Sequence, residues 1–348
     1  MKITASAPGK VVILGEYAVL EGAPALAMAV DRRVRVELTT NDGPYCSVAA
    51  PGWTHRPARF HFDACGHPRF AADGEPFQIP VHVMEKMFSG PGHRPMIPFH
   101  LTLDSAALMQ AGPGGGAKLG LGSSAALTVA LCHALGYYVA SQHGGAHTPD
   151  LSTLIDIHCG LQTRLGSGVD VAASLLGGLI EYNRLPAPQA QPAELPRDVE
   201  YCFVWSGVPA VTTRFLAAVD RWRRDHPERF RRLMAPLMEI AASGTLAARA
   251  GDGDDFLRVV SEYAAALQML GEASGADILS EPHRRLRELA GRRDVVYKPC
   301  GAGGGDIGIG MSRDPDALAE FRADLCAENF QSLSLNMDRK GVRTRSEN

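Results

Sequence analysis

Lysine is scarce in this chain, although basic residues are not. Six lysines stand against 29 arginines. Lys10, Lys118 and Lys298 lie inside or beside glycine-containing segments. A lysine ammonium is a compact charge whose pKa shifts readily, and an arginine guanidinium does not replace it. We therefore interpret these three lysines as candidates for a chemical role, with an exposed surface charge as the ordinary alternative.

The chain also lacks the signals of several protein classes. Its seven cysteines are odd in number and widely spaced, with no Cys-x-x-Cys pair, which argues against a zinc site or a disulfide scaffold. No apolar run reaches the roughly 18 residues of a membrane span, and the N-terminus has no apolar signal stretch. The formal net charge is −3, so no basic field favours nucleic acid or a membrane. We expect a cytoplasmic globular protein whose partner is a small-molecule substrate.

Length and composition predict two domains. A chain of 348 residues exceeds what one hydrophobic core usually serves. Residues 184–198 hold four prolines and few apolar residues, as linkers do. We expect an N-terminal domain at 1–190, a C-terminal domain at 191–338 and a disordered polar tail at 339–348.

Hydrophobic periodicity predicts both strands and helices along the chain. In residues 2–15 we expect a strand, a tight turn at Lys10 and a second strand. Two further strands are expected at 25–30 and 33–39. Residues 40–75, rich in glycine, proline and aromatic residues, are expected to form an irregular excursion or a lid over a site.

A glycine-rich loop precedes an apolar helical segment at 125–140. Gly120 and Gly122 allow close approach of a ligand to the backbone, and a helix start with serines suits a phosphate. No Gly-Lys-Ser/Thr run of the Walker A type is present. Gly120-x-Gly122-x-x-Ala125 fits a loose dinucleotide pattern, but the acidic residue expected roughly 20 positions later is missing. A phosphate cradle and an ordinary capped helix both stay open.

Two other segments carry candidate chemistry. Asp170 lies between Gly166-Ser167-Gly168 and an apolar helix, where a carboxylate is either a helix cap or a catalytic group. The run from Lys298 to Asp306 contains four glycines. Such density favours close packing against a ligand or another loop.

In this order and spacing, the glycine-containing segments resemble the GHMP kinase superfamily. Pro8-Gly9-Lys10 with Gly15-Glu16-Tyr17 resembles its first motif, residues 120–126 its second and residues 298–306 its third. The resemblance spans residues 5–312. Within the superfamily the details are most similar to phosphomevalonate kinase: residues 15–22, Lys118, residues 166–172 and residues 305–309.

The resemblance implies two α/β domains with the site in the cleft between them. The N-terminal half would resemble a ribosomal protein S5 domain, and the C-terminal half a ferredoxin-like fold. It implies ATP and Mg²⁺ as cofactors, with Ser124 on the metal. The catalytic residues would be Lys10, near the transferring phosphoryl group, and Asp170, facing the acceptor. The residues that would bind ATP are Lys118, Gly120, Leu121, Gly122, Ser123, Ser124 and Ala125. Those near the acceptor would be Glu16, Tyr17, Ser167, Gly168, Thr213, Arg214, Gly301, Ala302, Gly303, Gly304 and Asp306.

The sequence also departs from the mevalonate kinases of this superfamily. These usually carry histidine where Tyr17 stands, and a metal-binding glutamate where Cys159 stands. A second protein ligand for Mg²⁺ is therefore not identified. We expect phosphorylation of phosphomevalonate to diphosphomevalonate, with Asp170 as base or as orienting group. The alternatives are a kinase acting on a hydroxyl (of mevalonate or another small alcohol), an enzyme like diphosphomevalonate decarboxylase, and an inactive small-molecule sensor. A homodimer is left open, and the acceptor pocket is expected to use residues 40–75 and 206–214.

Overall fold

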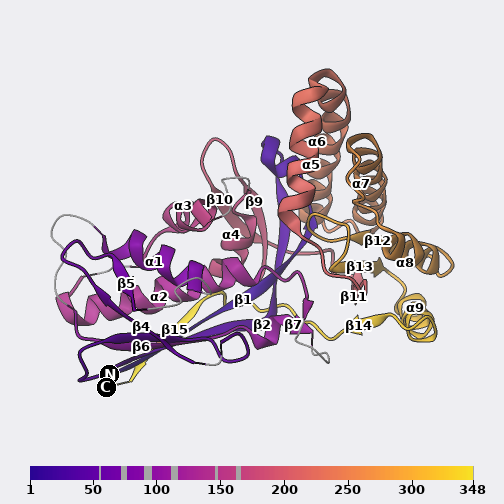
Figure 1. The fold of residues 1–348 in the computed structure, drawn as a ribbon. Coiled ribbons are helices and arrows are strands. Elements are labelled where there is room, and N and C mark those ends of the chain that lie inside the picture. The colour runs from indigo at the N-terminus through magenta and orange to yellow at the C-terminus, as the bar shows by residue number, and fades with distance from the viewer. Residues whose placement is uncertain are drawn as a thin grey trace.

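The chain folds into two large sheets, each covered by helices (Figure 1), and a small sheet of two strands, β7 (Met109–Gln110) and β8 (Ala117–Lys118). The computed structural model describes residues 1–54, 56–71, 77–89, 96–110, 117–145, 148–161 and 166–347. Helices α1 to α4 lie over the first sheet, and helices α5 to α9 surround the second (Figure 1). One hydrophobic cluster of buried residues continues through both halves. The α/β architecture agrees with the sequence prediction.

Two long antiparallel strands form the spine of the first sheet. Strand β1 spans Lys2–Leu14 and strand β2 spans Ala25–Thr40. The predicted turn at Lys10 and the predicted break in β2 are both wrong. Gly9 pairs with Val30 while Pro8 pairs with Arg33, so the two extra residues of β2 form an irregularity that accommodates the proline within a continuous strand.

Segment 40–75 extends the first sheet in its described part, and the prediction of an irregular lid is wrong there. It contributes strands β3 (Cys46–Ala49), β4 (Ala58–Phe62) and β5 (Pro68–Phe70). Strand β3 pairs in parallel with β6 (Phe99–Asp104). Phe60 is buried and stacks on Phe70 with 5.0 Å between ring centroids. These aromatic residues form core, which is why the segment does not cover the site.

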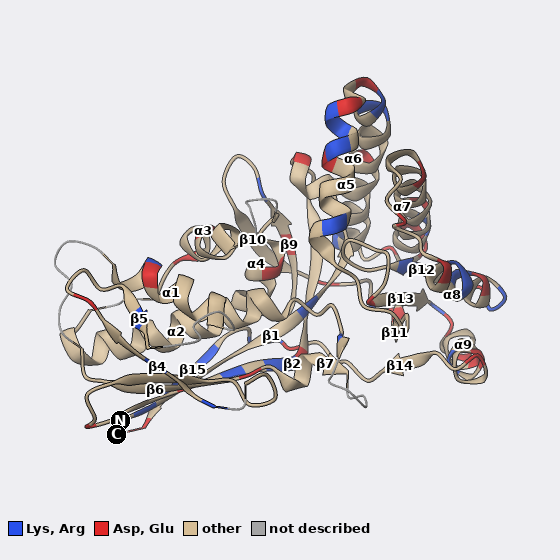
Figure 2. Cartoon of the chain, viewed as in Figure 1, with Lys and Arg blue, Asp and Glu red and all other residues tan. Residues whose placement is uncertain are grey.

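Four helices pack on this sheet: α1 (Gln78–Phe88), α2 (Ser123–His143), α3 (Leu151–Leu161) and α4 (Val169–Leu176). Helix α2 is long and apolar enough to cross a membrane by length and composition alone. It carries no charged residue (Figure 2). In the fold 61% of its apolar window is buried, and it packs against β1 and β2. We therefore describe it as the central core helix.

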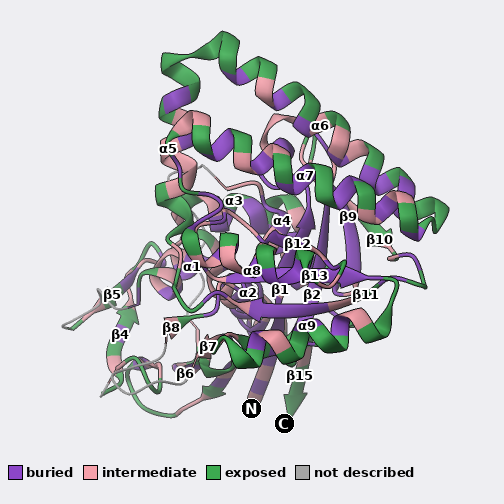
Figure 3. Cartoon of the chain, turned by 90° about the vertical axis from the view of Figure 1, so that its right-hand side faces the viewer, coloured by how far each residue is buried: buried purple, intermediate pink, exposed green. Residues whose placement is uncertain are grey.

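The second half has a four-stranded antiparallel sheet in the order β12-β13-β11-β14. Its strands are β11 (Glu200–Trp205), β12 (Val296–Pro299), β13 (Ile307–Ser312) and β14 (Gln331–Leu333). Its helices are α5 (Thr212–Asp225), α6 (Pro227–Ala250), α7 (Gly253–Ser274), α8 (Glu281–Gly291) and α9 (Pro315–Ala327). Figure 3 shows the strands largely buried and the outer helix faces exposed.

The connection between the two sheets runs through the proline-rich segment. Strand β9 (Leu179–Asn183) pairs with β2, and β10 (Gln189–Ala193) pairs with β9. Both strands therefore belong to the first sheet, and the second begins with β11.

The prediction of a disordered tail from residue 339 is wrong. Strand β15 (Arg343–Glu347) pairs antiparallel with β1, with Lys2 opposite Glu347. The two termini therefore lie together (Figure 1). The polar composition reflects an exposed edge strand, since the outer face of a sheet edge tolerates charged side chains.

Candidate active site

The glycine-rich loop lies directly before helix α2. Gly120 and Gly122 have φ values of 76° and 74°, a region that favours glycine. Gly122 is the N-cap of α2 and makes no side-chain cap hydrogen bond. Ser123 and Ser124 are thus the first two helical residues, and an ordinary serine-capped helix is not what the structure contains. The unpaired N–H groups at this helix start form a binding element for an anion.

Close packing against two charged residues explains both glycines. A Cβ on Gly122 would lie 3.0 Å from Cε of Lys10. A Cβ on Gly120 would overlap the side chain of Asp306. The backbone N–H of Lys10 also donates to the carbonyl of Leu121 at 2.8 Å. Strand β1, the loop and the third glycine run therefore converge at one point.

Asp170 lies in the first turn of α4. The helix begins after Gly168, whose φ is 85°. Oδ1 of Asp170 accepts the N–H of Val171 at 3.0 Å. A Cβ on Gly168 would lie 2.7 Å from Cδ1 of Ile155, so this glycine supports the turn. No ion pair joins Asp170 to Lys10 in the part of the chain that the structure describes.

A buried ion pair joins the first motif to the third. The Lys298 ammonium, fully buried at the end of β12, donates to Oε1 of Glu16, whose side chain is 3% exposed. Lys298 also donates to the Pro299 carbonyl at 2.8 Å. The N–H of Gly301 donates to the same Glu16 oxygen at 3.3 Å. Among the described residues, Oε2 of Glu16 has no hydrogen-bond partner.

Tyr17 reinforces this junction. It adopts a positive φ of 62°, and its hydroxyl donates to the carbonyl of Ala302 at 2.6 Å. Burial, and then the charge of Glu16, raise the pKa of Tyr17 above its usual value. The neutral phenol therefore serves as a hydrogen-bond donor between the two halves of the molecule.

Asp306 closes the other side of the junction. Its Oδ1 accepts the N–H of Ala210 at 2.9 Å. Burial raises the pKa of Asp306, and the Ala210 bond and the Lys10 and Lys118 charges only partly offset that effect. The carboxylate thus ties loop 206–212 to the phosphate loop.

These elements line an open cavity of about 380 Å³. Fifteen of the residues singled out from the sequence line it: Lys10, Glu16, Tyr17, Lys118, Gly120, Leu121, Gly122, Ser123, Ser124, Ser167, Asp170, Thr213, Gly301, Ala302 and Asp306. Ala210, Val211 and Thr212 also line it and lie within segment 206–214, which was expected at the acceptor pocket. The lining residues that the sequence did not single out one by one are Val12, Val19, Leu20, Gly166, Val169, Leu216 and Cys300. Most of these are apolar, and no local signal separates them from core residues.

Five of the proposed site residues do not line the cavity: Ala125, Gly168, Arg214, Gly303 and Gly304. Ala125 is buried within α2, and Arg214 is exposed on α5. A Cβ on Gly303 would overlap the carbonyl of Ile278, and one on Gly304 the ring of Phe215. These two glycines therefore pack against residues that do not line the cavity, and they support the glycine-rich segment 301–305. The described part of segment 40–75 does not line the cavity either.

A metal ion would find few protein ligands here. Among the described residues no group of three or more His, Cys, Asp or Glu side chains could hold one. The cavity offers the Ser124 hydroxyl and the carboxylates of Asp170 and Glu16. Mg²⁺ commonly binds proteins through one or two side chains and takes its other ligands from phosphates and water. This donor set therefore fits Mg²⁺ in the company of a nucleotide.

Comparison with known proteins gives similar relatives along nearly the whole chain, although no protein-family model matches it. A phosphomevalonate kinase of Streptomyces sp. (strain CL190) is 27% identical over 356 residues, covering 89% of each chain. A mevalonate kinase of Methanothermobacter thermautotrophicus is 31% identical over 244 residues, covering 69% of each. Among solved structures, a Listeria innocua protein superposes with a TM-score of 0.83 at 22% identity, covering 100% of both chains. Streptococcus pneumoniae phosphomevalonate kinase, in complex with phosphomevalonate and AMPPNP, superposes with a TM-score of 0.73 at 19% identity, covering 96% of this chain and 99% of its own.

Proposed function

This chain belongs to the GHMP kinase superfamily, and we propose that it transfers the γ-phosphoryl group of ATP to phosphomevalonate, forming diphosphomevalonate. The observation that carries the proposal is the meeting of the phosphate loop, Lys10 and Asp170 around one cavity. Phosphoryl transfer depends mainly on positioning and on neutralising charge. These three elements supply both.

The phosphate loop and Lys10 act on the donor. The N–H groups that begin helix α2 bind phosphate oxygens, with the positive end of the helix behind them. Lys10 and Lys118 add positive charge at the same cavity, which stabilises the negative charge of the transferring group. Ser124 and the carboxylate of either Asp170 or Glu16 would hold Mg²⁺, which supplies further charge neutralisation at the phosphates.

Asp170 acts on the acceptor. A phosphate monoester is already largely dianionic at pH 7, because its second pKa is about 6. No proton then needs to be removed, and Asp170 orients the acceptor. With an alcohol acceptor the same carboxylate would be the base. Asp170 and Lys10 line the same cavity, and no ion pair joins them in the described structure.

A second cavity supports an acceptor with an anion at its far end. It has about 210 Å³ and shares Tyr17, Leu20 and Leu216 with the first. Arg184 lines it and donates to the carbonyl of Leu20 at 3.3 Å. Within the described ranges Arg184 has no carboxylate partner. Its guanidinium is therefore available for the carboxylate of phosphomevalonate.

Mevalonate is the second candidate acceptor, favoured by the 31% identity to a mevalonate kinase. The deciding experiment measures ADP release from ATP and Mg²⁺ with 5-phosphomevalonate or mevalonate in parallel. Turnover with the phosphorylated compound alone supports the proposal. Turnover with mevalonate alone refutes it and makes Asp170 the base.

Two controls complete this experiment. Diphosphomevalonate, assayed for CO₂ release, tests a decarboxylase. The Asp170→Asn variant tests the carboxylate: unchanged turnover, with ATP and acceptor still bound, would exclude both of its proposed roles.

A further inference from the structure

The last residues of the chain return from the second sheet to the first (Figure 1). We call residues 336–347 the C-terminal clasp. Asn336 begins it by donating through its side chain to Asp31 at 2.8 Å, while the Asp31 N–H donates back to the Asn336 carbonyl at 2.9 Å. The clasp ends with strand β15, which pairs with β1. The pair nearest to Lys10 is Arg343 with Ser6, and Ser6 lies four residues before Lys10 on β1. The clasp is thus fastened to both long strands.

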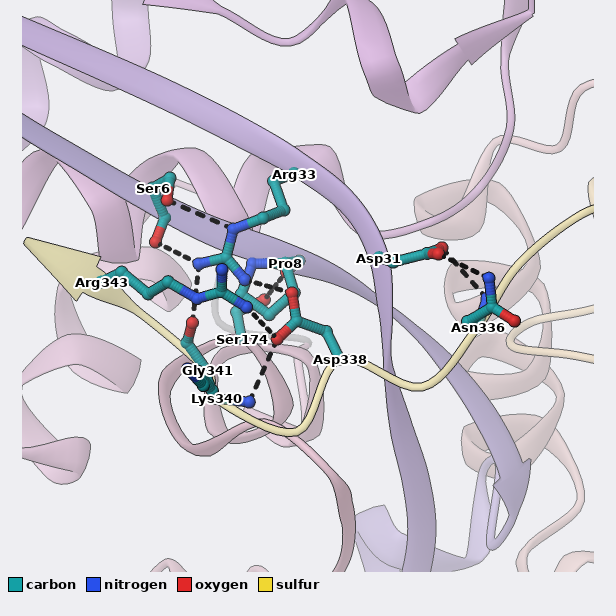
Figure 4. A network of polar contacts seen from close by, with 10 residues as sticks. All are labelled: Ser6, Pro8, Asp31, Arg33, Ser174, Asn336, Asp338, Lys340, Gly341 and Arg343. Carbon is teal, nitrogen blue, oxygen red and sulfur yellow. Dashed lines mark hydrogen bonds and ion pairs between the residues drawn. The ribbon is translucent and has the colours of Figure 1, made fainter.

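Asp338 is the centre of the clasp (Figure 4). It is 6% exposed. Its Oδ1 accepts the Lys340 N–H at 3.0 Å and the Arg343 guanidinium at 2.9 Å, and its Oδ2 accepts Arg33. Burial raises the pKa of Asp338, but the Lys340 bond and the two guanidinium groups together hold it below the usual value. The network therefore holds an ionised carboxylate, and Arg33 extends it to Ser6 of β1 through a 2.7 Å bond.

The clasp also contacts the C-terminal end of helix α4. The N–H of Val342 donates to the carbonyl of Leu175 at 3.1 Å, and the N–H of Gly178 donates to the carbonyl of Asp338 at 2.7 Å. Gly341 has a φ of 57°, and a Cβ there would overlap the Leu175 carbonyl oxygen. Gly177 is packed equally tightly against Gly341. The end of α4 and the clasp therefore touch backbone to backbone.

Helix α4 itself connects this contact to the cavity. It has eight residues and is about 12 Å long. Asp170 lies in its first turn, and Leu175 in its last. Ser174 Oγ, between them, donates to the Pro8 carbonyl of β1 at 2.9 Å. A displacement at the clasp would carry along the whole short helix.

From this arrangement we infer that the C-terminal clasp sets the position of α4, and through it the position of Asp170 relative to Lys10. Asp338 and Gly341 are then positioning residues of the reaction, although neither lines the cavity. The inference rests on the proposed function for its catalytic meaning. Its structural part, that the clasp holds α4, stands independently.

The test compares two variants of the same clasp. Gly341→Ala places a methyl group against the Leu175 carbonyl. Asp31→Ala removes the two side-chain hydrogen bonds that hold Asn336, a residue that makes no hydrogen bond to α4 in the described structure. Below the onset of unfolding, Gly341→Ala should lower kcat about tenfold or more and leave KM for ATP within about twofold. Asp31→Ala should leave both constants within about twofold.

A double-mutant cycle with Asp170→Asn separates positioning from general damage. If the clasp acts through Asp170, Gly341→Ala should add little to the loss already caused by Asp170→Asn. The inference is overturned if the kcat losses of Gly341→Ala and Asp170→Asn multiply in the double variant. It is also overturned if Gly341→Ala and Asp31→Ala have the same kcat. If Gly341→Ala does not fold, Asp338→Asn takes its place in the cycle.

A readout without turnover keeps the inference distinct from the proposed function. Hydrogen exchange of the amides of residues 172–176 should accelerate about tenfold in Gly341→Ala and much less in Asp31→Ala. Unchanged exchange would overturn the inference even in an active enzyme. An inactive wild-type protein with accelerated exchange in Gly341→Ala would refute the proposed function and leave the clasp's hold on α4 supported.

Discussion

The buried pair of Lys298 and Glu16 offers the sharpest test of how the two halves are joined. The two side chains are 0% and 3% exposed. Lys298→Met removes the ammonium and leaves the Glu16 carboxylate with the 3.3 Å bond from Gly301. Breaking a buried ion pair in this way costs about 3–5 kcal/mol. A domain is stable by only about 5–15 kcal/mol, so the loss should be large.

Removing both charges should cost less than breaking the pair. The Glu16→Gln/Lys298→Met variant buries a neutral amide, whose unmade hydrogen bonds cost about 1–3 kcal/mol. We therefore expect the double variant to be more stable than Lys298→Met alone. Physically, the second substitution removes the uncompensated charge that the first leaves behind.

Urea denaturation at pH 7 measures this cycle. The matched control is Lys86→Met, because Lys86 is exposed on α1, and its replacement should change the free energy of unfolding by less than about 0.5 kcal/mol. The reasoning is refuted if Lys298→Met costs no more than Lys86→Met. It is also refuted if the two single losses simply add in the double variant.

Three further predictions concern the site and its surroundings. Gly120→Ala should lower turnover about 100-fold, because its Cβ would overlap Asp306; kinetics of Gly251→Ala, with a similar φ of 70° and open space around it, provide the control. Burial lowers the pKa of His283 from 6.5 to about 4. As the pH falls, this histidine therefore takes up a proton in the unfolded chain before it does so in the folded protein. About 3 kcal/mol of the free energy of unfolding should be lost between pH 6.5 and pH 4. Urea midpoints across that range should show the loss in the wild type and not in His283→Gln. Arg184→Gln should raise KM for phosphomevalonate about tenfold, with kcat and KM for ATP unchanged. Arg223→Gln should raise this KM less, because the Arg223 guanidinium already pairs with Glu21 and Asp220. An equal effect of both variants on KM would contradict the assignment of Arg184 to the acceptor carboxylate.

Local structure was the most predictable level of this protein. The loop at Gly120 and Gly122, the core helix α2 and the helix that begins beside Asp170 were all expected from short patterns. A glycine's access to positive φ and an apolar period of a helix are properties of neighbouring residues. They need no knowledge of the rest of the chain.

Two expectations failed because the structure of the segment depends on distant partners. Pro8 and Gly9 indicated a turn, yet β2 supplies two extra residues that let them stay in a strand. Residues 339–348 suggested a disordered tail, yet Arg343 of this segment pairs with the buried Asp338, which also binds Arg33. A polar segment can be ordered when its charges find partners elsewhere in the fold.

The sequence by itself singled out the residues to which we assign chemistry: a scarce lysine, a glycine loop and a carboxylate at a helix start. Only the tertiary structure decided that Lys298 neutralises Glu16, 282 residues away along the chain, and that Asp306 rests on Gly120. The physical reason is that glycine conformation and helix periodicity are encoded within a few neighbouring residues. The energy of a buried charge depends on which distant group the fold places beside it.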